Sequence, residues 1–122
     1  MRQKPLHSLT KRRDFKAVFN EGVSSSSSFL VIYAKPNEFS FSRLGLAVSR
    51  KIGNAVLRNR IRRLLREAMR ECVKDMAEHY DFVIIARKES AEGTLKMFIS
   101  SIEKFIQKLY HAKNSTIIHS RL

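Results

Sequence analysis

The segment formed by residues 57–72 constrains this chain more than any other, because its apolar residues recur every three or four positions. This period is typical of a helix with one apolar stripe, which must be buried against other elements. The stripe consists of Leu57, Ile61, Leu64, Leu65, Ala68 and Cys72. The fold must therefore supply a core on one side of this helix and leave the other side to solvent or to a partner.

The other side of the same helix is rich in arginine. Between residues 50 and 66 the sequence has seven basic residues and no acidic one. A solvated helix face usually mixes charges of both signs, since neighbouring acids relieve the repulsion. Arginine also outnumbers lysine here, and its planar guanidinium binds phosphate in a bidentate manner. We therefore interpret this face as a contact surface for nucleic acid, in preference to a plain solvated face.

The charge of the whole chain supports this interpretation. Lys and Arg total 24 and Asp and Glu total 11, which gives a formal charge of +13 in 122 residues. Such a surplus attracts polyanions, either nucleic acid or an anionic membrane. No apolar run approaches the ~20 residues of a spanning helix, and no apolar segment follows the basic N-terminus as in a signal peptide. Because Cys72 is the only cysteine and forms no internal disulfide, a reducing cytoplasm fits best.

Helices and strands are predicted to alternate around the arginine-rich helix. We expect a helix from Ser8 or Thr10 to Gly22, strands over 29–34 and 43–50, the long helix from 56 to about 76, a strand over 81–87 and a helix ending near Tyr110. This order, α-β-β-α-β-α, predicts an α+β sandwich, a small sheet with helices packed on it, in a single domain spanning 1–122. Residues 1–7 and 113–122 are expected to be flexible, and the serine tract at 24–28 is expected to be a flexible loop.

Two of the predicted strands have different side chains on their two faces. In the second strand the bulky residues Leu44, Leu46 and Val48 alternate with the small residues Gly45, Ala47 and Ser49. If the bulky set faces the core, the small set faces something that approaches closely. In the first strand Val31 and Tyr33 face that same side. Small residues beside an aromatic ring suit a single strand of nucleic acid, whose bases stack on aromatic side chains.

The connection before the long helix adds a weaker signal. Gly53 is expected to allow a tight turn and Asn54 to cap the helix, where exposed N–H groups can receive a phosphate. Residues 49–56, Ser-Arg-Lys-Ile-Gly-Asn-Ala-Val, then run into Arg58-Asn59-Arg60-Ile61-Arg62-Arg63-Leu64-Leu65-Arg66. This combined segment resembles the signature of the protein component of bacterial ribonuclease P. Weaker matches extend over nearly the whole chain, at Asp14-Phe15, Phe19, Gly22, Tyr33, Arg43-Leu44-Gly45-Leu46 and Ile84-Ile85-Ala86-Arg87.

The resemblance implies a partner and a function. It implies a small basic protein that binds the catalytic RNA subunit of ribonuclease P and the 5′ leader of precursor tRNA. The RNA would hydrolyse the phosphodiester with Mg²⁺, which is bound chiefly by RNA and by no recognisable protein site, and the protein would broaden the range of precursors. It also implies a left-handed βαβ crossover, against the usual right-handed rule.

The resemblance further assigns residues to the two RNA ligands. The residues for the RNA subunit are Arg58, Asn59, Arg60, Arg62, Arg63 and Arg66. The residues for the leader cleft are Phe15, Phe19, Val31, Tyr33, Ser49 and Lys51, with Arg87 as an accessory contact at its edge. Arg62 stands where the family often has lysine, which keeps the charge. Without the resemblance, Phe15 and Phe19 are read as plain core residues of an amphipathic helix, whereas with it they are expected to be partly exposed.

No set of residues in the sequence suggests a protein active site. The four histidines are scattered, and the carboxylates lie singly or along helix faces. Asp14 is interpreted as a helix-start residue and Asp81 as a turn residue. Two other classes of function remain open: a ribosomal or general RNA-chaperone module, and a nuclease that acts through its own carboxylates.

Overall fold

The computed structural model describes residues 6–121, with side chains described through His111. Its elements are β1 (Leu6–Ser8), α1 (Arg12–Glu21), β2 (Val23–Ser26), β3 (Leu30–Pro36), β4 (Ser42–Ala47), α2 (Ala55–Val73), β5 (Tyr80–Ala86) and α3 (Leu95–Arg121). Two short 3-10 helices, η1 (Arg50–Ile52) and η2 (Lys88–Glu92), follow β4 and β5.

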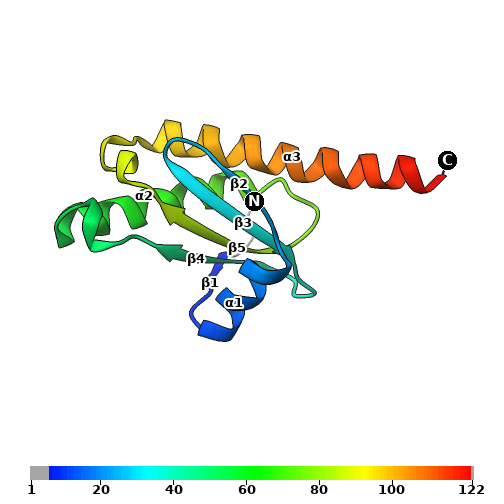
Figure 1. Ribbon diagram of the computed structural model, residues 1–122, viewed down its shortest axis with the longest axis horizontal. Helices are drawn as coiled ribbons and strands as arrows, with labels where there is room; N and C mark the ends of the chain where they lie inside the picture. The colour runs from blue at the N-terminus through cyan, green and yellow to red at the C-terminus, as the bar shows by residue number, and fades with distance from the viewer. Residues whose placement is uncertain (1–5, 122) are drawn as a thin grey trace.

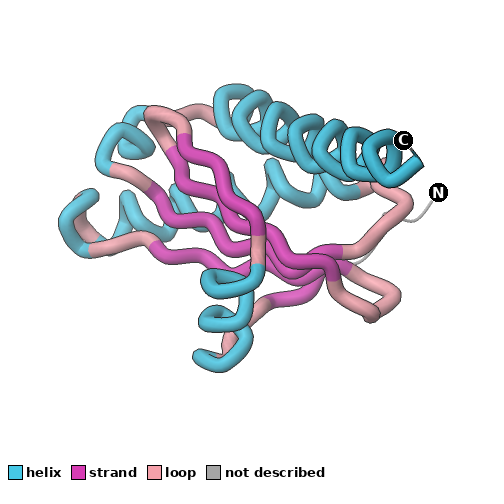
Figure 2. The backbone as a smooth tube through the Cα atoms, turned by 45° about the vertical axis from the view of Figure 1, so that its right-hand side comes forward, coloured by secondary structure: helices cyan, strands magenta, loops and turns pink. Residues whose placement is uncertain are grey.

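The five strands form one mixed sheet in the order β1-β4-β5-β3-β2. β4 and β5 are parallel neighbours joined through α2, whereas β3 runs antiparallel to both β5 and β2. α2 and α3 cover one face of the sheet and α1 lies on the other (Figures 1 and 2). The predicted α+β architecture is therefore confirmed, and the two strands joined through the long helix pair in parallel. The left hand of that crossover stays a prediction.

The main core lies between the sheet and the pair α2 and α3. Alternate residues of β3 and β5, such as Leu30, Ile32, Phe82 and Ile84, point toward these helices and are almost fully buried. The helices meet them with Ile61, Leu65, Phe98 and Ile102, each at most 1% exposed. The predicted apolar stripe of α2 thus packs inward. None of the helices within residues 6–121 is both long enough and apolar enough to cross a bilayer.

The sequence did not predict the two short strands. Leu6 and His7, expected in a flexible arm, belong to β1, which pairs in parallel with β4. Ser24–Ser26, expected in a flexible loop, belong to β2, which pairs with β3. Both pairings are made by backbone groups, which side-chain patterns do not reveal. Residues 1–5, the rest of the predicted flexible arm, lie outside the described residues.

The helix boundaries also differ from the prediction. α1 begins at Arg12, and Lys11 precedes it without a side-chain capping bond, so neither Ser8 nor Thr10 caps it. α3 continues to Arg121, past the predicted end at Tyr110 and through the segment that was expected to be a flexible tail. Its final turns project beyond the sheet (Figure 1).

The sheet face under α1 has three rows of side chains across β3, β5 and β4. The register places Lys35, Asp81 and Arg43 in the first row, Tyr33, Val83 and Gly45 in the second, and Val31, Ile85 and Ala47 in the third. α1 covers the second row, where Val18 and Leu9 bury Val83. All three residues of the third row are partly exposed. One end of this face is therefore covered by a helix, and the other end is more open.

Candidate nucleic-acid interface

The start of α2 is built by Gly53 and Asn54. The Asn54 side chain accepts a hydrogen bond from the Leu57 backbone N–H at 2.9 Å, which confirms the predicted cap. Gly53 is extended and makes no tight turn. A Cβ there would lie 2.6 Å from Cδ2 of Leu57, so any larger residue would require the Leu57 side chain to shift. The first turn of α2 is thus held by a cap on one side and by a close Gly53–Leu57 contact on the other.

The arginine side of α2 faces outward. Asn59, Arg60, Arg63 and Arg66 are exposed, whereas Arg58 and Arg62 are partly buried. Arg62 Nη1 donates to Asn59 Oδ1 at 3.0 Å, so Asn59 orients a neighbouring guanidinium. The buried Nε of Arg58 has no hydrogen-bond partner within the described residues. None of the salt bridges in that part of the chain involves an arginine of α2, so these guanidinium groups form no ion pair with a described carboxylate.

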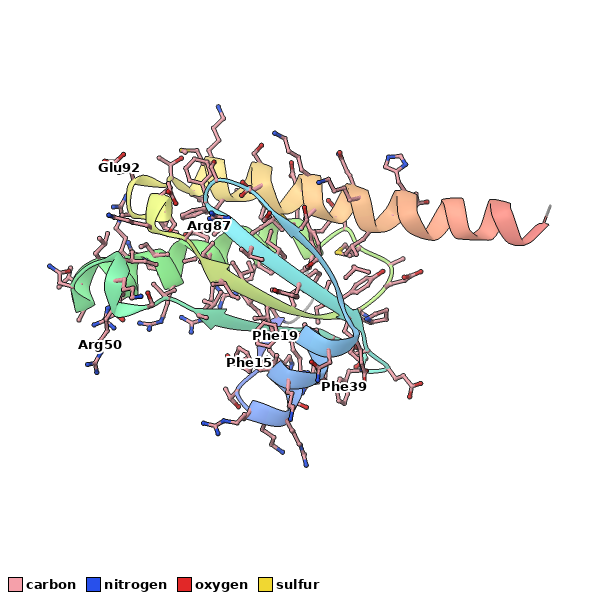
Figure 3. The ribbon with its side chains drawn as sticks, in the orientation of Figure 1. Phe15, Phe19, Phe39, Arg50, Arg87 and Glu92 are labelled. Carbon is pink, nitrogen blue, oxygen red and sulfur yellow. The ribbon has the colours of Figure 1, made fainter. Side chains whose placement is uncertain are left out.

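A second basic group lies where β4 and β5 end. Because the two strands are parallel neighbours, their carboxyl ends reach the same edge of the sheet. Ser49 and Lys51 follow β4, and Arg87 follows β5; all three are exposed. Figure 3 shows Arg50 and Arg87 at this end of the molecule. The structure thus brings three of the predicted leader residues to one edge, next to the start of α2.

The aromatic residues predicted for the leader form a cluster between α1 and β3. The Phe19 ring meets the Tyr33 ring edge-on at 4.9 Å, and the centroids of Phe15 and Phe19 are 6.4 Å apart. Phe19 is 40% exposed, and Phe15 and Tyr33 are half-buried, so the expectation of partial exposure is confirmed. Figure 3 shows Phe15 and Phe19 on α1, on the side of the sheet away from α3. Val31, the remaining leader residue, lies in the more open third row.

Gly45 is small for a different reason from the one predicted. A Cβ at this position would lie 2.4 Å from Cζ of Phe15, so the Phe15 ring rests directly on the Gly45 backbone. At Gly45, the close approach comes from this chain's own aromatic ring. Ala47, one row farther along β4, remains partly exposed. Room for an external ligand is therefore found at the third row.

An ion-pair network below the aromatic cluster was missed. Asp81 is a buried residue of β5, not a turn residue. Arg43, on the neighbouring strand β4, donates two hydrogen bonds to the Asp81 carboxylate, from Nε to Oδ1 at 2.8 Å and from Nη2 to Oδ2 at 2.5 Å. Arg43 Nη1 also reaches Asp14 Oδ2 on α1 at 3.4 Å. The side-chain pattern carries no signal for this pair, because only the register of β4 against β5 places Arg43 opposite Asp81.

The pKa of the Asp81 carboxyl shows which influence prevails in this network. Burial raises this pKa. Hydrogen bonds from Arg43 and Asn37, together with the charges of Arg43 and Lys35, lower it by more than burial raises it, so the pKa lies below its ordinary value. The pKa of Arg43 is raised, chiefly by its hydrogen bond to Asp81, despite the opposing effect of burial. Both groups are therefore charged at neutral pH.

The carboxylates of the described residues do not form a metal site. No three His, Cys, Asp or Glu side chains within that part of the chain lie close enough together to hold an ion. Asp14 and Asp81 are both engaged by Arg43. Apolar cavities beside α3, lined by residues such as Met76, Tyr80 and Leu109, include none of the predicted site residues. The arrangement as a whole is suited to binding an extended, negatively charged polymer.

Comparison with known proteins supports the same interpretation. Residues 4–110 match the ribonuclease P family. The ribonuclease P protein component of Caldanaerobacter subterraneus subsp. tengcongensis is 40% identical over 115 residues, covering 93% of this chain and 98% of that protein. The Staphylococcus aureus RNase P protein has a TM-score of 0.73 at 33% identity, covering 84% of this chain and 94% of that one. A mutant of the Staphylococcus aureus protein described as having defective mRNA degradation activity has a TM-score of 0.74 at 31% identity, covering 85% of this chain and 88% of that one. The chain therefore belongs to the family of ribonuclease P protein components.

Proposed function

We propose that this chain is the subunit of ribonuclease P that binds the RNA subunit through α2 and the 5′ leader of precursor tRNA through the sheet face under α1. The RNA subunit carries out the endonucleolytic step that yields the mature 5′ end, and the protein broadens the range of precursors. One observation carries the proposal. An arginine face that makes no ion pair within the described residues adjoins a sheet face that combines partly exposed aromatic rings with a basic edge.

The contact with the RNA subunit is assigned to Arg58, Asn59, Arg60, Arg62, Arg63 and Arg66. No salt bridge within the described residues pairs the exposed guanidinium groups of this set with a carboxylate. Phosphates that bind these groups can therefore release their condensed counter-ions to the solution. Asn59 contributes by orienting Arg62. The rigid helix beneath, packed on the core through Ile61 and Leu65, keeps these groups in a fixed array.

The leader is assigned to a path along β5. It begins at Phe19 and Tyr33, crosses the open row of Val31, and ends at Ser49, Lys51 and Arg87. From Val83 to Arg87 the strand advances about 13 Å, which is enough for a few unpaired nucleotides. Aromatic rings at one end would stack on bases, and cations at the other end would meet phosphates. Phe15 contributes mainly by supporting Phe19, because its own ring packs on Gly45.

Magnesium, on this proposal, is held chiefly by RNA. A protein site for Mg²⁺ needs free carboxylate oxygens. Here Asp14 and Asp81 already bind Arg43, so neither carboxylate fits that requirement. The protein's part in the reaction is therefore to bind and orient its RNA ligands.

A reconstitution assay tests the proposal. The pure chain is incubated with precursor tRNA and Mg²⁺, with and without the RNA subunit. We expect no cleavage by the protein alone, and a gain in cleavage at low Mg²⁺ when protein is added to the RNA. Cleavage by the protein alone, or no gain in the presence of the RNA, would contradict the proposal.

The same assay examines two other candidate functions. The description of the Staphylococcus aureus mutant favours mRNA degradation by the protein itself. An added arm with a single-stranded mRNA and no RNA subunit tests this activity. A general RNA chaperone would instead accelerate annealing of unrelated RNA strands as effectively as it assists precursor cleavage.

Phe19→Ala tests the leader path. Phe19 is 40% exposed and its loss should leave the core intact. If one base stacks there, the contact contributes about 1–3 kcal/mol. The holoenzyme's preference for precursor over mature tRNA should then fall by about five- to 150-fold. Tyr110→Ala, which removes another exposed ring on α3, is the matched control and should leave this ratio unchanged. An unchanged ratio in Phe19→Ala would refute stacking at this ring.

A further inference from the structure

We propose that Arg43 is a positioning residue for the leader path, because it fixes the N-terminal end of α1 to the sheet through Asp14. This inference rests on the proposed leader function. Arg43 touches neither ligand on this proposal. It acts by setting where the α1 rings Phe15 and Phe19 stand above the sheet.

Arg43 is itself held rigidly. Its guanidinium makes two hydrogen bonds to Asp81, which sits directly opposite in the β4–β5 register. Asn37 Nδ2 donates to the same carboxylate at 2.8 Å, and the Phe39 ring lies 4.7 Å from the guanidinium carbon. A side chain fixed on several sides has little freedom left to lose when it binds one more group. Its remaining Nη1 therefore points from a fixed place toward Asp14.

α1 has few other attachments to the sheet. Among its residues only Val18 is fully buried. At the C-terminal end the backbone of Gly22 lies against β3, where a Cβ would come within 2.7 Å of the Ala34 carbonyl oxygen. The other ion pair of α1, Glu21 with Lys35, is also at that end, and the Glu21 side chain is 63% exposed. The Asp14–Arg43 contact is thus the ionic attachment of the opposite end, and its side chains are only 24% and 18% exposed.

The attached end is also the end that carries Phe15. Asp14 precedes Phe15 in the chain, and Phe15 sits on Gly45, two residues after Arg43 on β4. Phe19 lies about one turn farther along the helix and leans on Tyr33. If Asp14 is released, α1 can tilt about its tight contact at Gly22. Phe15 would then lift from Gly45, and Phe19 would shift relative to Tyr33.

Asp14→Asn isolates this role, since it leaves both hydrogen bonds between Arg43 and Asp81 in place. Ion pairs with this degree of exposure are weak, so the preference of the holoenzyme for precursor over mature tRNA should fall by about two- to five-fold. A purely electrostatic effect would not lower this ratio, because removing a negative charge strengthens binding of any RNA. Glu21→Gln, with the same charge change at the other end of α1, is the matched control and should not lower the ratio.

Two further measurements separate positioning from other effects. In Asp14→Asn, amide hydrogen exchange should accelerate in α1 while that of α2 stays unchanged. In a variant that already carries Phe15→Ala and Phe19→Ala, adding Asp14→Asn should not alter the precursor preference further, because the Asp14 substitution acts only through those two rings.

These experiments distinguish a failure of the Arg43 inference from a failure of the proposed leader path. If Phe19→Ala lowers the precursor preference but Asp14→Asn does not, the positioning inference is wrong and the leader path stands. If neither substitution lowers it, the leader path itself is wrong. An equal loss in Glu21→Gln would overturn the inference by showing that any charge change on α1 has the same effect.

Discussion

Asp81→Asn is expected to lower the free energy of unfolding by about 3 kcal/mol, near the lower end of the range for breaking one side of a buried ion pair. Asp81 is 5% exposed and accepts two hydrogen bonds from Arg43 and one from Asn37. An amide at this position leaves the guanidinium without its main counter-ion. The loss of stability lies near the lower end of that range because the Arg43 side chain is 18% exposed and keeps its ion pair with Asp14. Urea unfolding of the free protein, followed by circular dichroism, measures the change.

Glu71→Gln is the matched control for this experiment. Glu71 accepts a hydrogen bond from Lys74 at 2.5 Å, but both side chains are exposed, at 45% and 38%. Surface pairs of this kind contribute little, so the control should change stability by less than about 1 kcal/mol. If Asp81→Asn has no larger effect than Glu71→Gln, the network does not stabilise the fold.

The same pair predicts how stability depends on pH. The pKa of Asp81 is lower in the folded protein than in the unfolded chain, where it is about 3.9. A carboxyl of this kind stabilises the fold fully above its unfolded pKa, and the contribution is lost as pH falls through the folded pKa. The stability difference between the native protein and Asp81→Asn should therefore be constant above about pH 5 and shrink below about pH 4. A difference that grows on acidification would contradict this assignment.

The parts of the fold that follow side-chain periodicity were predictable. The apolar stripe of α2 and the alternation in β3 and β4 each indicated which residues face the core, because burial selects for them directly. Ile61, Leu65 and Leu30 are buried as that pattern required. Cys72 also packs against the core, and burial raises its thiol pKa to about 12, so it is uncharged at neutral pH.

The parts that depend on pairing between distant segments were not predictable from one sequence. β2 is a polar edge strand held by backbone hydrogen bonds, and a serine tract gives no periodic signal for such a strand. Arg43 and Asp81 are 38 residues apart, and only the register of β4 against β5 places them opposite each other. The ion pair and its link to Asp14 therefore required the structure.

The apolar loop residues Phe39 and Phe41 had no explanation in the sequence. Their rings stack on each other at 5.2 Å, and the exposed His7 of β1 stacks on Phe41 at 3.7 Å. Phe39 also faces the Arg43 guanidinium at 4.7 Å. The loop between β3 and β4 thus packs against both β1 and the Arg43 network. Its aromatic residues have a structural role beside the proposed leader path.

The triple substitution Arg60→Ala, Arg63→Ala, Arg66→Ala is expected to weaken binding of the RNA subunit by about 150-fold, if each exposed guanidinium contributes about 1 kcal/mol. All three side chains point away from the core and have no carboxylate partner within the described residues. Their removal should therefore leave folding intact. The slope of log affinity against log salt concentration should become shallower by about three units, one for each lost phosphate contact. Filter binding across a salt series measures both quantities.

A control of equal charge separates a local phosphate contact from the general attraction of a basic protein. Lys96→Ala, Lys104→Ala, Lys108→Ala removes the same charge from exposed positions on α3, outside the arginine face. Because exposed charges act weakly beyond about 10 Å at ordinary salt, this variant should change the salt slope by less than about one unit. Equal losses in the two variants would mean that net charge governs binding. A steep slope retained in the arginine variant would place the RNA subunit on another surface, since counter-ions are released only where phosphates meet the protein.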